Sequence, residues 1–125
     1  DEEMTEAELI EASANYNGLM QGWVSIYFTA LTAFIITAYL AGEKLTKNQA
    51  VFVCGGFLIL SSLATIGAYG TGTLLVHFAK EVEATSPNRP FLANYPIIFV
   101  STALLTTGIL GSLKFMWDVR HPKTE

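Results

Sequence analysis

Hydrophobic residues in this chain are gathered into three long stretches instead of being spread along the sequence. Residues 22–42, 50–79 and 96–113 contain no Asp, Glu, Lys or Arg. An α-helix needs about 20 mostly apolar residues to cross the roughly 30 Å hydrocarbon core of a bilayer. Each stretch is about that long or longer, so the pattern predicts an all-α membrane protein with three transmembrane helices. One such stretch could be a signal peptide, but three separated by polar turns could not.

The start of the first helix is marked by Thr5 and Glu8, which have the spacing of a capping box. We therefore expect an acidic helix over residues 1–18, outside the membrane, followed by the first span at about 19–42. The run Asn15-Tyr16-Asn17-Gly18 is typical of turns, so it is a candidate kink or break between the two.

A short connection is expected between the first two spans. Gly42 suits the position after a helix end, where a positive φ favours glycine. Thr46 and Gln49 form a second capping box, which predicts a new helix from residue 47. Only residues 43–45 separate the two helices, so we expect a tight antiparallel hairpin.

The second helix is predicted to be longer than a bilayer is thick. It should run over about 47–83, a length of about 55 Å at 1.5 Å per residue. The first two helices should therefore extend beyond the bilayer on the N-terminal side, where the acidic helix can pack against the second. A loop at 84–94, a third span at about 95–118 and a tail at 119–125 complete a single three-helix transmembrane domain covering residues 1–125.

Charge is unevenly placed along the chain. The net charge is −4, and no Lys or Arg precedes Lys44. No basic patch could hold nucleic acid, which excludes that class of partner. Short cytoplasmic segments are enriched in Lys and Arg, so we expect the N-terminus outside and the C-terminus in the cytoplasm. The expected location is a bacterial inner membrane. The hairpin turn and C-terminal side carry Lys44, Lys47, Lys114, Arg120 and Lys123, and the other side carries Lys80 and Arg89.

Small residues recur every four positions in each span. Because lipid provides no hydrophobic force between helices, small side chains that let backbones approach closely drive helix packing. The ridges predict packing either inside the bundle or against another subunit, and the third span has two adjacent ridges. The predicted packing residues are Ser25, Thr29, Ala33 and Thr37 in the first span, Ala64, Ala68 and Gly72 in the second, and Ala103, Thr107 and Gly111 in the third, with Gly108 and Ser112 alongside.

Candidate chemistry is sparse. His77 is the one histidine associated with a span, and Thr73 one turn earlier could make room for a ring ligand such as haem. A second axial ligand is lacking, because His121 lies at the other end of the molecule, so an ordinary interfacial histidine is the favoured interpretation. Membrane enzymes usually carry intramembrane ionisable groups. We find no acid–base pair, metal-ligand spacing or activated nucleophile, and expect no catalytic residue, metal or cofactor.

The sequence therefore favours a non-catalytic integral membrane protein. It would act as a structural or accessory subunit through helix packing, in a homo-oligomer or in a larger membrane complex. A homo-oligomeric pore or membrane-perturbing protein is one alternative, with a path lined by Thr29, Thr65, Thr71 and Thr106. A binder of lipid or of a hydrophobic small molecule is the other, in an outer groove near Trp23, Tyr69 and His77.

Overall fold

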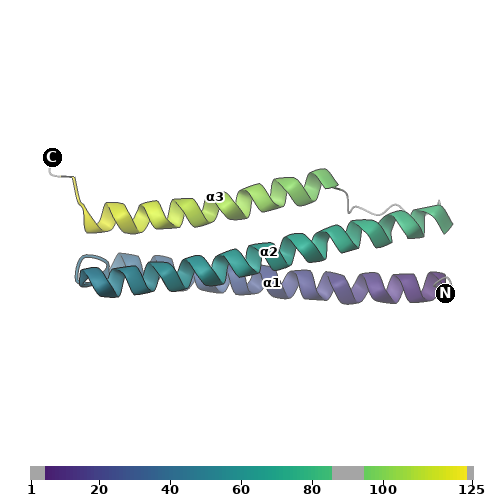
Figure 1. The fold of residues 1–125 in the computed structure, drawn as a ribbon, viewed down its shortest axis with the longest axis horizontal. Helices are drawn as coiled ribbons and strands as arrows, with labels where there is room; N and C mark the ends of the chain where they lie inside the picture. The colour runs from purple at the N-terminus through teal and green to yellow at the C-terminus, as the bar shows by residue number, and fades with distance from the viewer. Residues whose placement is uncertain (1–4, 86–94, 124–125) are drawn as a thin grey trace.

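The computed structural model describes residues 5–85 and 95–123, and within them the chain forms three long helices. These are α1 (Glu6–Ala41), α2 (Lys47–Thr85) and α3 (Tyr95–Arg120) (Figure 1). Each contains a stretch long and apolar enough to cross a membrane, and at most 28% of the residues in any of these stretches are buried. Most of the apolar surface therefore faces outward, as it does in lipid and not in a water-soluble bundle. The protein is an all-α, three-helix integral membrane protein.

The first capping box is present, and the helix that it starts is longer than expected. The Glu8 amide donates to Thr5 Oγ1 at 3.3 Å, and the Thr5 amide donates to Glu8 Oε2 at 2.8 Å. α1 then continues to Ala41 without interruption, so no break occurs at 15–18. Tyr16, inside that run, stacks on Phe78 of α2 with ring centroids 5.3 Å apart. Helix-breaking propensities of about 1 kcal/mol or less per residue are readily overridden by such packing.

Gly42 ends α1, but not in the expected conformation. Its φ and ψ are −54° and −43°, in the right-handed helical region, so the prediction of a positive φ is wrong. The need for glycine comes from close contacts with both α1 and α3. A Cβ atom on Gly42 would lie nearest to the Ala38 carbonyl oxygen of α1 and 2.8 Å from Val119 Cγ1 of α3. Glycine here allows the end of α3 to approach the turn closely.

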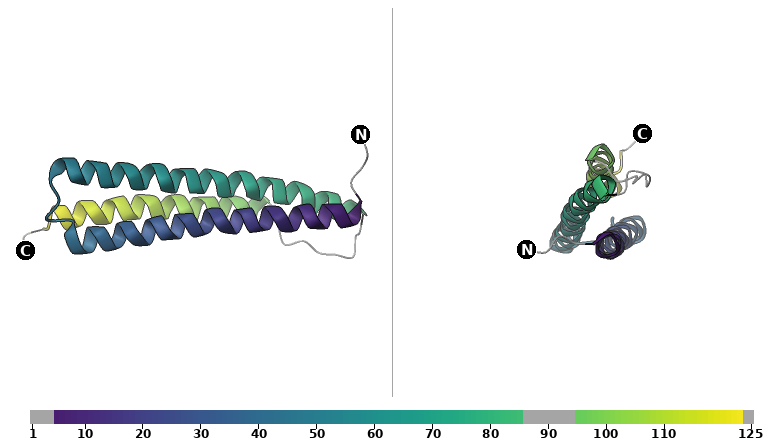
Figure 2. Two further views of the ribbon diagram at one scale, coloured as in Figure 1. Left: turned by 90° about the horizontal axis from the view of Figure 1, so that it is seen from below. Right: turned by 90° about the vertical axis from the view of Figure 1, so that its right-hand side faces the viewer.

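The second capping box and the hairpin are as expected. The Gln49 amide donates to Thr46 Oγ1 at 3.2 Å, and the Thr46 amide donates to Gln49 Oε1 at 2.9 Å. α2 starts at Lys47 and runs antiparallel to α1, with which it packs along most of its length (Figure 2). The predicted loop at 84–94 lies outside the described residues, apart from Ala84 and Thr85 in the last turn of α2.

α3 lies over the seam between α1 and α2 (Figures 1 and 2). The helices have 36, 39 and 26 residues, or about 54, 58 and 39 Å at 1.5 Å per residue. α1 and α2 therefore extend past the start of α3 (Figure 1). We call the end with the α1–α2 turn and the C-terminus the hairpin end, and the opposite end the acidic end.

The interior is small and built largely around one aromatic pair. Phe34 of α1 and Phe57 of α2 stack with centroids 4.2 Å apart. Tyr27 is 2% exposed, and its hydroxyl donates to the Leu105 carbonyl of α3 at 2.6 Å. The core cluster that contains them consists of Tyr27, Ala30, Phe34, Ala38, Phe57, Ala64, Ile109 and Met116.

Candidate functional site

The small-residue ridge of α2 lies inside the molecule. Ala64, Ala68 and Gly72 are all buried. A Cβ atom on Gly72 would lie 2.6 Å from Ile98 Cδ1 of α3, so glycine permits that contact. This ridge serves packing within the three-helix bundle.

The ridges of α1 and α3 are mostly on the outside. Ser25, Thr29 and Ala33 are exposed and Thr37 is half-buried. In α3 the neighbouring ridge faces inward: Ser112 is buried, and Gly108 lies against the Tyr27 hydroxyl. The ridge beside it is exposed; its residues are Ala103, Thr107 and Gly111.

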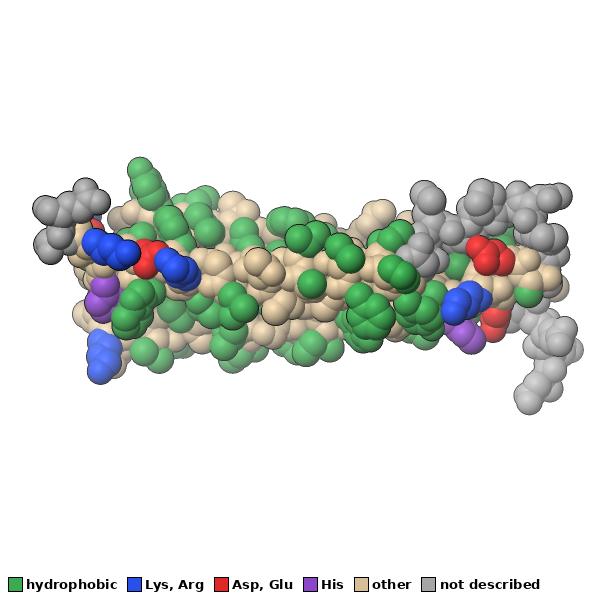
Figure 3. Space-filling view, turned by 90° about the horizontal axis from the view of Figure 1, so that it is seen from above, with side chains coloured by type: hydrophobic (Ala, Val, Ile, Leu, Met, Phe, Trp, Pro, Cys, Tyr) green, Lys and Arg blue, Asp and Glu red, His purple; other side chains and the backbone are tan. Residues whose placement is uncertain are grey.

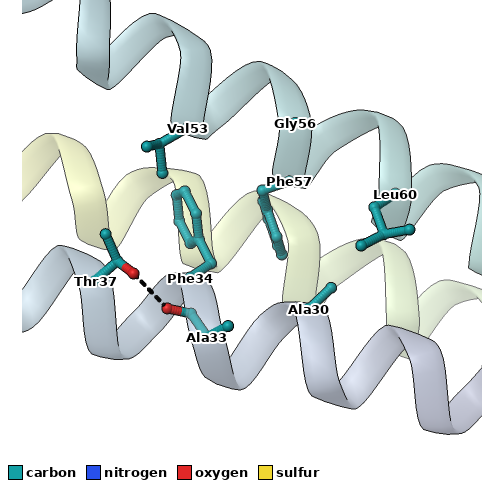
Figure 4. Close-up of a pocket in the computed structure, with 8 residues that line it drawn as sticks. All are labelled: Ala30, Ala33, Phe34, Thr37, Val53, Gly56, Phe57 and Leu60. Atoms are coloured by element: carbon teal, nitrogen blue, oxygen red, sulfur yellow. Dashed lines mark hydrogen bonds between the residues drawn. The ribbon is translucent and has the colours of Figure 1, made fainter.

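A groove of about 220 Å³ lies along the α1–α2 seam, on the side that α3 does not cover (Figure 4). We call it the seam groove. The Phe34–Phe57 stack lies in it, and small residues lie beside that stack. Gly56 has no atom within 4 Å of the place a Cβ would take. Thr37 turns its hydroxyl to the Ala33 carbonyl at 2.8 Å, so the donor is satisfied within α1. The lining residues are Ala30, Ala33, Phe34, Thr37, Val53, Gly56, Phe57 and Leu60.

A second hollow lies beside the first on the outer face of α1. Its volume is about 480 Å³, and Ala33 lines both hollows. The exposed small residue Ala33 is therefore flanked by two depressions. A low ridge between two hollows is a suitable surface for helix packing, because the side-chain ridges of another helix fit into such hollows. The second hollow is lined by Phe28, Thr29, Thr32, Ala33 and Ile36.

The residues of the expected outer groove have separate neighbours. Trp23 is half-buried, with its ring against Gly67. Tyr69 is exposed and its ring lies 6.2 Å from that of Phe99. In the described ranges, no hydrogen bond, ion pair or ring contact joins any two of Trp23, Tyr69 and His77.

His77 is exposed and has a carboxylate partner. Its Nε2 atom lies 3.0 Å from Glu81 Oε1, one helical turn further along α2. Within residues 5–85 and 95–123, no group of three or more His, Cys, Asp or Glu side chains is placed to hold a metal ion. The geometry at His77 is that of a surface ion pair, formed when the ring is protonated.

The threonines of the possible pore do not share a surface. Thr65 and Thr71 are buried in the bundle, whereas Thr29 and Thr106 are exposed on different helices. Each hydroxyl donates to a carbonyl one turn back in its own helix, at 2.7–2.9 Å. Such bonds satisfy the hydroxyl donors without water.

A further groove, which sequence reasoning missed, lies between the start of α2 and the end of α3. We call it the basic groove; its volume is about 520 Å³. Arg120 Nη1 donates to the carbonyls of Gly42 and Leu45 at 2.9 and 2.8 Å, which ties α3 to the hairpin turn. The groove is lined by Lys47, Ala50, Val51, Cys54, Leu113, Met116, Trp117, Arg120 and His121.

An aromatic pair forms one wall of the basic groove. The rings of Trp117 and His121 stack with centroids 4.0 Å apart. His121 Nδ1 lies 3.1 Å from the Trp117 carbonyl oxygen. Because a carbonyl only accepts, the proton of that bond is on Nδ1.

These surfaces differ in chemistry: the seam groove is apolar with small residues, and the basic groove joins apolar and cationic side chains. No protein-family model, curated protein or solved structure is detectably similar to this chain.

Proposed function

We propose that this protein is a non-catalytic accessory or structural subunit that docks a transmembrane helix in its seam groove. The docked helix belongs to a second copy of the chain or to a larger membrane complex. The observation that carries the proposal is the open side of the α1–α2 seam, where Ala33 is exposed between two hollows.

The shape of the seam explains how a further helix would be held. Two packed helices form a seam with two sides, and α3 occupies one of them (Figure 2). Ala33 and Gly56 leave room on the other side for close approach of a backbone. Close approach increases van der Waals contact, which drives helix association in lipid.

In a homo-oligomer, α3 of a neighbouring copy is a suitable occupant. Its ridge of Ala103, Thr107 and Gly111 is exposed and has no use inside the molecule. Such a contact joins two different surfaces, so it is of the head-to-tail kind that closes into a ring or extends into an array.

A non-catalytic role is supported by the absence of Asp, Glu, Lys and Arg from 22–42, 50–79 and 96–113. Such groups are costly in a membrane and are retained mainly for function. The surfaces that the described part of the chain offers inside the membrane are therefore suited to packing.

Orientation and location are part of the same proposal. In the full sequence, five of the seven Lys and Arg residues lie at 44–47 or 114–123, and the other two lie between the second and third uncharged stretches. By the bias of cytoplasmic segments toward Lys and Arg, the hairpin end lies in the cytoplasm. The membrane that we propose is a bacterial inner membrane.

The test compares Ala33→Phe with Ile59→Phe. The first fills the seam groove, whereas the second places the same ring on the outer face of α2, where Ile59 is 65% exposed. Each protein is crosslinked in its native membrane and purified in mild detergent to record its oligomeric state and co-purifying subunits. We expect wild type and I59F to assemble and A33F to be isolated as a helical monomer.

Two results would reject the proposal. One is a wild-type protein that is monomeric in the membrane and brings no other subunit with it. The other is an A33F variant that assembles as well as I59F does, since the seam groove would then have no role in assembly.

A further inference from the structure

We propose that the basic groove binds one anionic phospholipid. The lipid phosphate would lie at Lys47 and Arg120, and an acyl chain would follow the apolar wall formed by Val51, Cys54 and Leu113. The seam groove and the basic groove share no lining residue, so this site is independent of helix docking.

The position of the basic groove along the molecule matches the boundary of a bilayer. On α2, Lys47 precedes the uncharged stretch that begins at residue 50; on α3, the stretch ends at residue 113. The groove therefore begins in the hydrocarbon region and ends among the headgroups. Trp117, at the same end, has the amphipathic character that places tryptophan at membrane interfaces.

The charges lining the groove are of one sign. Lys47 and Arg120 are cationic, and no Asp or Glu is among the lining residues. Lys47 is exposed and forms no ion pair with any residue whose placement is described. The nearest charged pair on α3 neutralises itself: Lys114 Nζ lies 2.6 Å from Asp118 Oδ2, outside the groove lining.

Arg120 is already held in place for a phosphate. Both of its hydrogen bonds to the hairpin turn come from Nη1. The N–H groups on Nη2 and Nε remain, and a guanidinium presents such donors in a rigid fork that fits phosphate oxygens. Since the side chain is fixed before any ligand arrives, less conformational entropy is lost on binding.

The apolar half of the groove favours a lipid over a free anion. Ala50, Val51, Cys54, Leu113 and Met116 would gain nothing from inorganic phosphate, but they can contact a hydrocarbon chain. A volume of about 520 Å³ is within the range of roughly 300–1,000 Å³ for ligand sites. Basic pockets between transmembrane helices recognise anionic headgroups in this way.

The test is lipid retention by the full chain in native mass spectrometry. The protein in mild detergent is titrated with phosphatidylglycerol or with phosphatidylcholine of the same acyl chains. Wild type should retain one phosphatidylglycerol in preference to phosphatidylcholine. Lys47→Gln should weaken that binding roughly fivefold, the effect of one lysine near an anionic lipid. Lys44→Gln, which removes the same charge outside the groove lining, is the matched control and should bind as wild type does.

A second variant tests the apolar half. Val51→Trp places a large ring in the groove from a side chain that is 65% exposed, so the fold should tolerate it. We expect V51W to lose the bound phosphatidylglycerol while its helix content is unchanged.

Several outcomes would overturn the proposal. These are equal retention of the two lipids by wild type, equal losses in K47Q and K44Q, and full retention by V51W. Displacement of phosphatidylglycerol by millimolar inorganic phosphate would instead identify a site for free anions. None of these outcomes bears on assembly through the seam groove, which the A33F variant tests separately.

Discussion

At the scale of single residues, glycines that look alike in the sequence have different roles in the structure. Gly67 lies beneath the indole ring of Trp23, and a Cβ atom there would lie 2.9 Å from Cε3 and closer still to other ring atoms. Gly70, three residues later, has no atom within 4 Å of its Cβ position. Gly67 therefore allows α1 to approach α2 closely, whereas Gly70 does not lie at a close contact between helices.

This difference gives the first prediction. Gly67→Ala should lower the free energy of unfolding by about 1–3 kcal/mol, because the ring of Trp23 must move out of its contact. Gly70→Ala, on the same helix, should leave stability unchanged or raise it by up to about 1 kcal/mol through helix propensity. The measurement is reversible unfolding in mixed micelles with increasing SDS, followed by circular dichroism. Equal stability of the two variants would contradict the importance of the Trp23–Gly67 contact.

At the scale of elements, α3 is attached to the hairpin by few buried side chains and by polar bonds at two levels. Its buried residues are Ile98, Ile109, Ser112 and Met116. Tyr27 holds the middle of α3 through the Leu105 carbonyl, and Arg120 holds its end. These bonds fix the position of α3 along the hairpin, and with it the shape of the basic groove.

The second prediction concerns the middle attachment. Tyr27→Phe removes the hydroxyl that donates to Leu105 and should cost about 0.5–1.5 kcal/mol of stability. Tyr39→Phe is the matched control. Tyr39 is 75% exposed, so removing its hydroxyl should leave the free energy of unfolding unchanged. Stability is measured in the same micelles. Backbone hydrogen exchange should rise in α3 of Y27F, and unchanged exchange there would argue against this bond as a main attachment.

The sequence predicted the elements better than the contacts between them. Spans, capping boxes and the hairpin depend on residues close in the chain, and they are confirmed. No break occurs at 15–18, and the predicted positive φ at Gly42 is wrong. Contacts with other helices, which the local pattern does not reveal, occur at both positions. Lys47 and Arg120 line the basic groove together but come from different helices. Predicting the groove therefore requires the alignment of α2 with α3, which the local sequence pattern does not specify.

Local sequence pattern also does not specify whether a small-residue ridge faces into or out of the bundle. A period of four residues shows that a ridge exists on a helix but not what it faces. Ala64 and Ala33 belong to similar ridges, yet only Ala64 is buried. The packing of the three helices decides which ridges are exposed.

At the scale of the whole molecule, charge is concentrated at the two ends of a long apolar rod. On the face shown in Figure 3, Lys, Arg, Asp and Glu side chains lie near the ends and hydrophobic ones between them. At the acidic end, α1 and α2 pack together beyond the start of α3 (Figure 1). Leu9 and Val82 are buried in that part, at 4% and 0% exposure. The projecting end is thus a packed structure in its own right, not a pair of loose helix ends.

This arrangement predicts which positions share a side of the membrane. Single cysteines replace Lys44, Lys123 or Glu83 in a Cys54→Ser background, and sealed vesicles are treated with a membrane-impermeant maleimide. Lys44→Cys and Lys123→Cys should react from one side and Glu83→Cys from the other, because α1 and α3 both end at the hairpin end and α2 ends at the acidic end. In whole bacterial cells, only E83C should react if the hairpin end is cytoplasmic. Reaction of K44C and K123C from opposite sides would require an odd number of spans between them. That result would contradict the structure, because α2 and α3 together bring the chain back to the side from which α2 started.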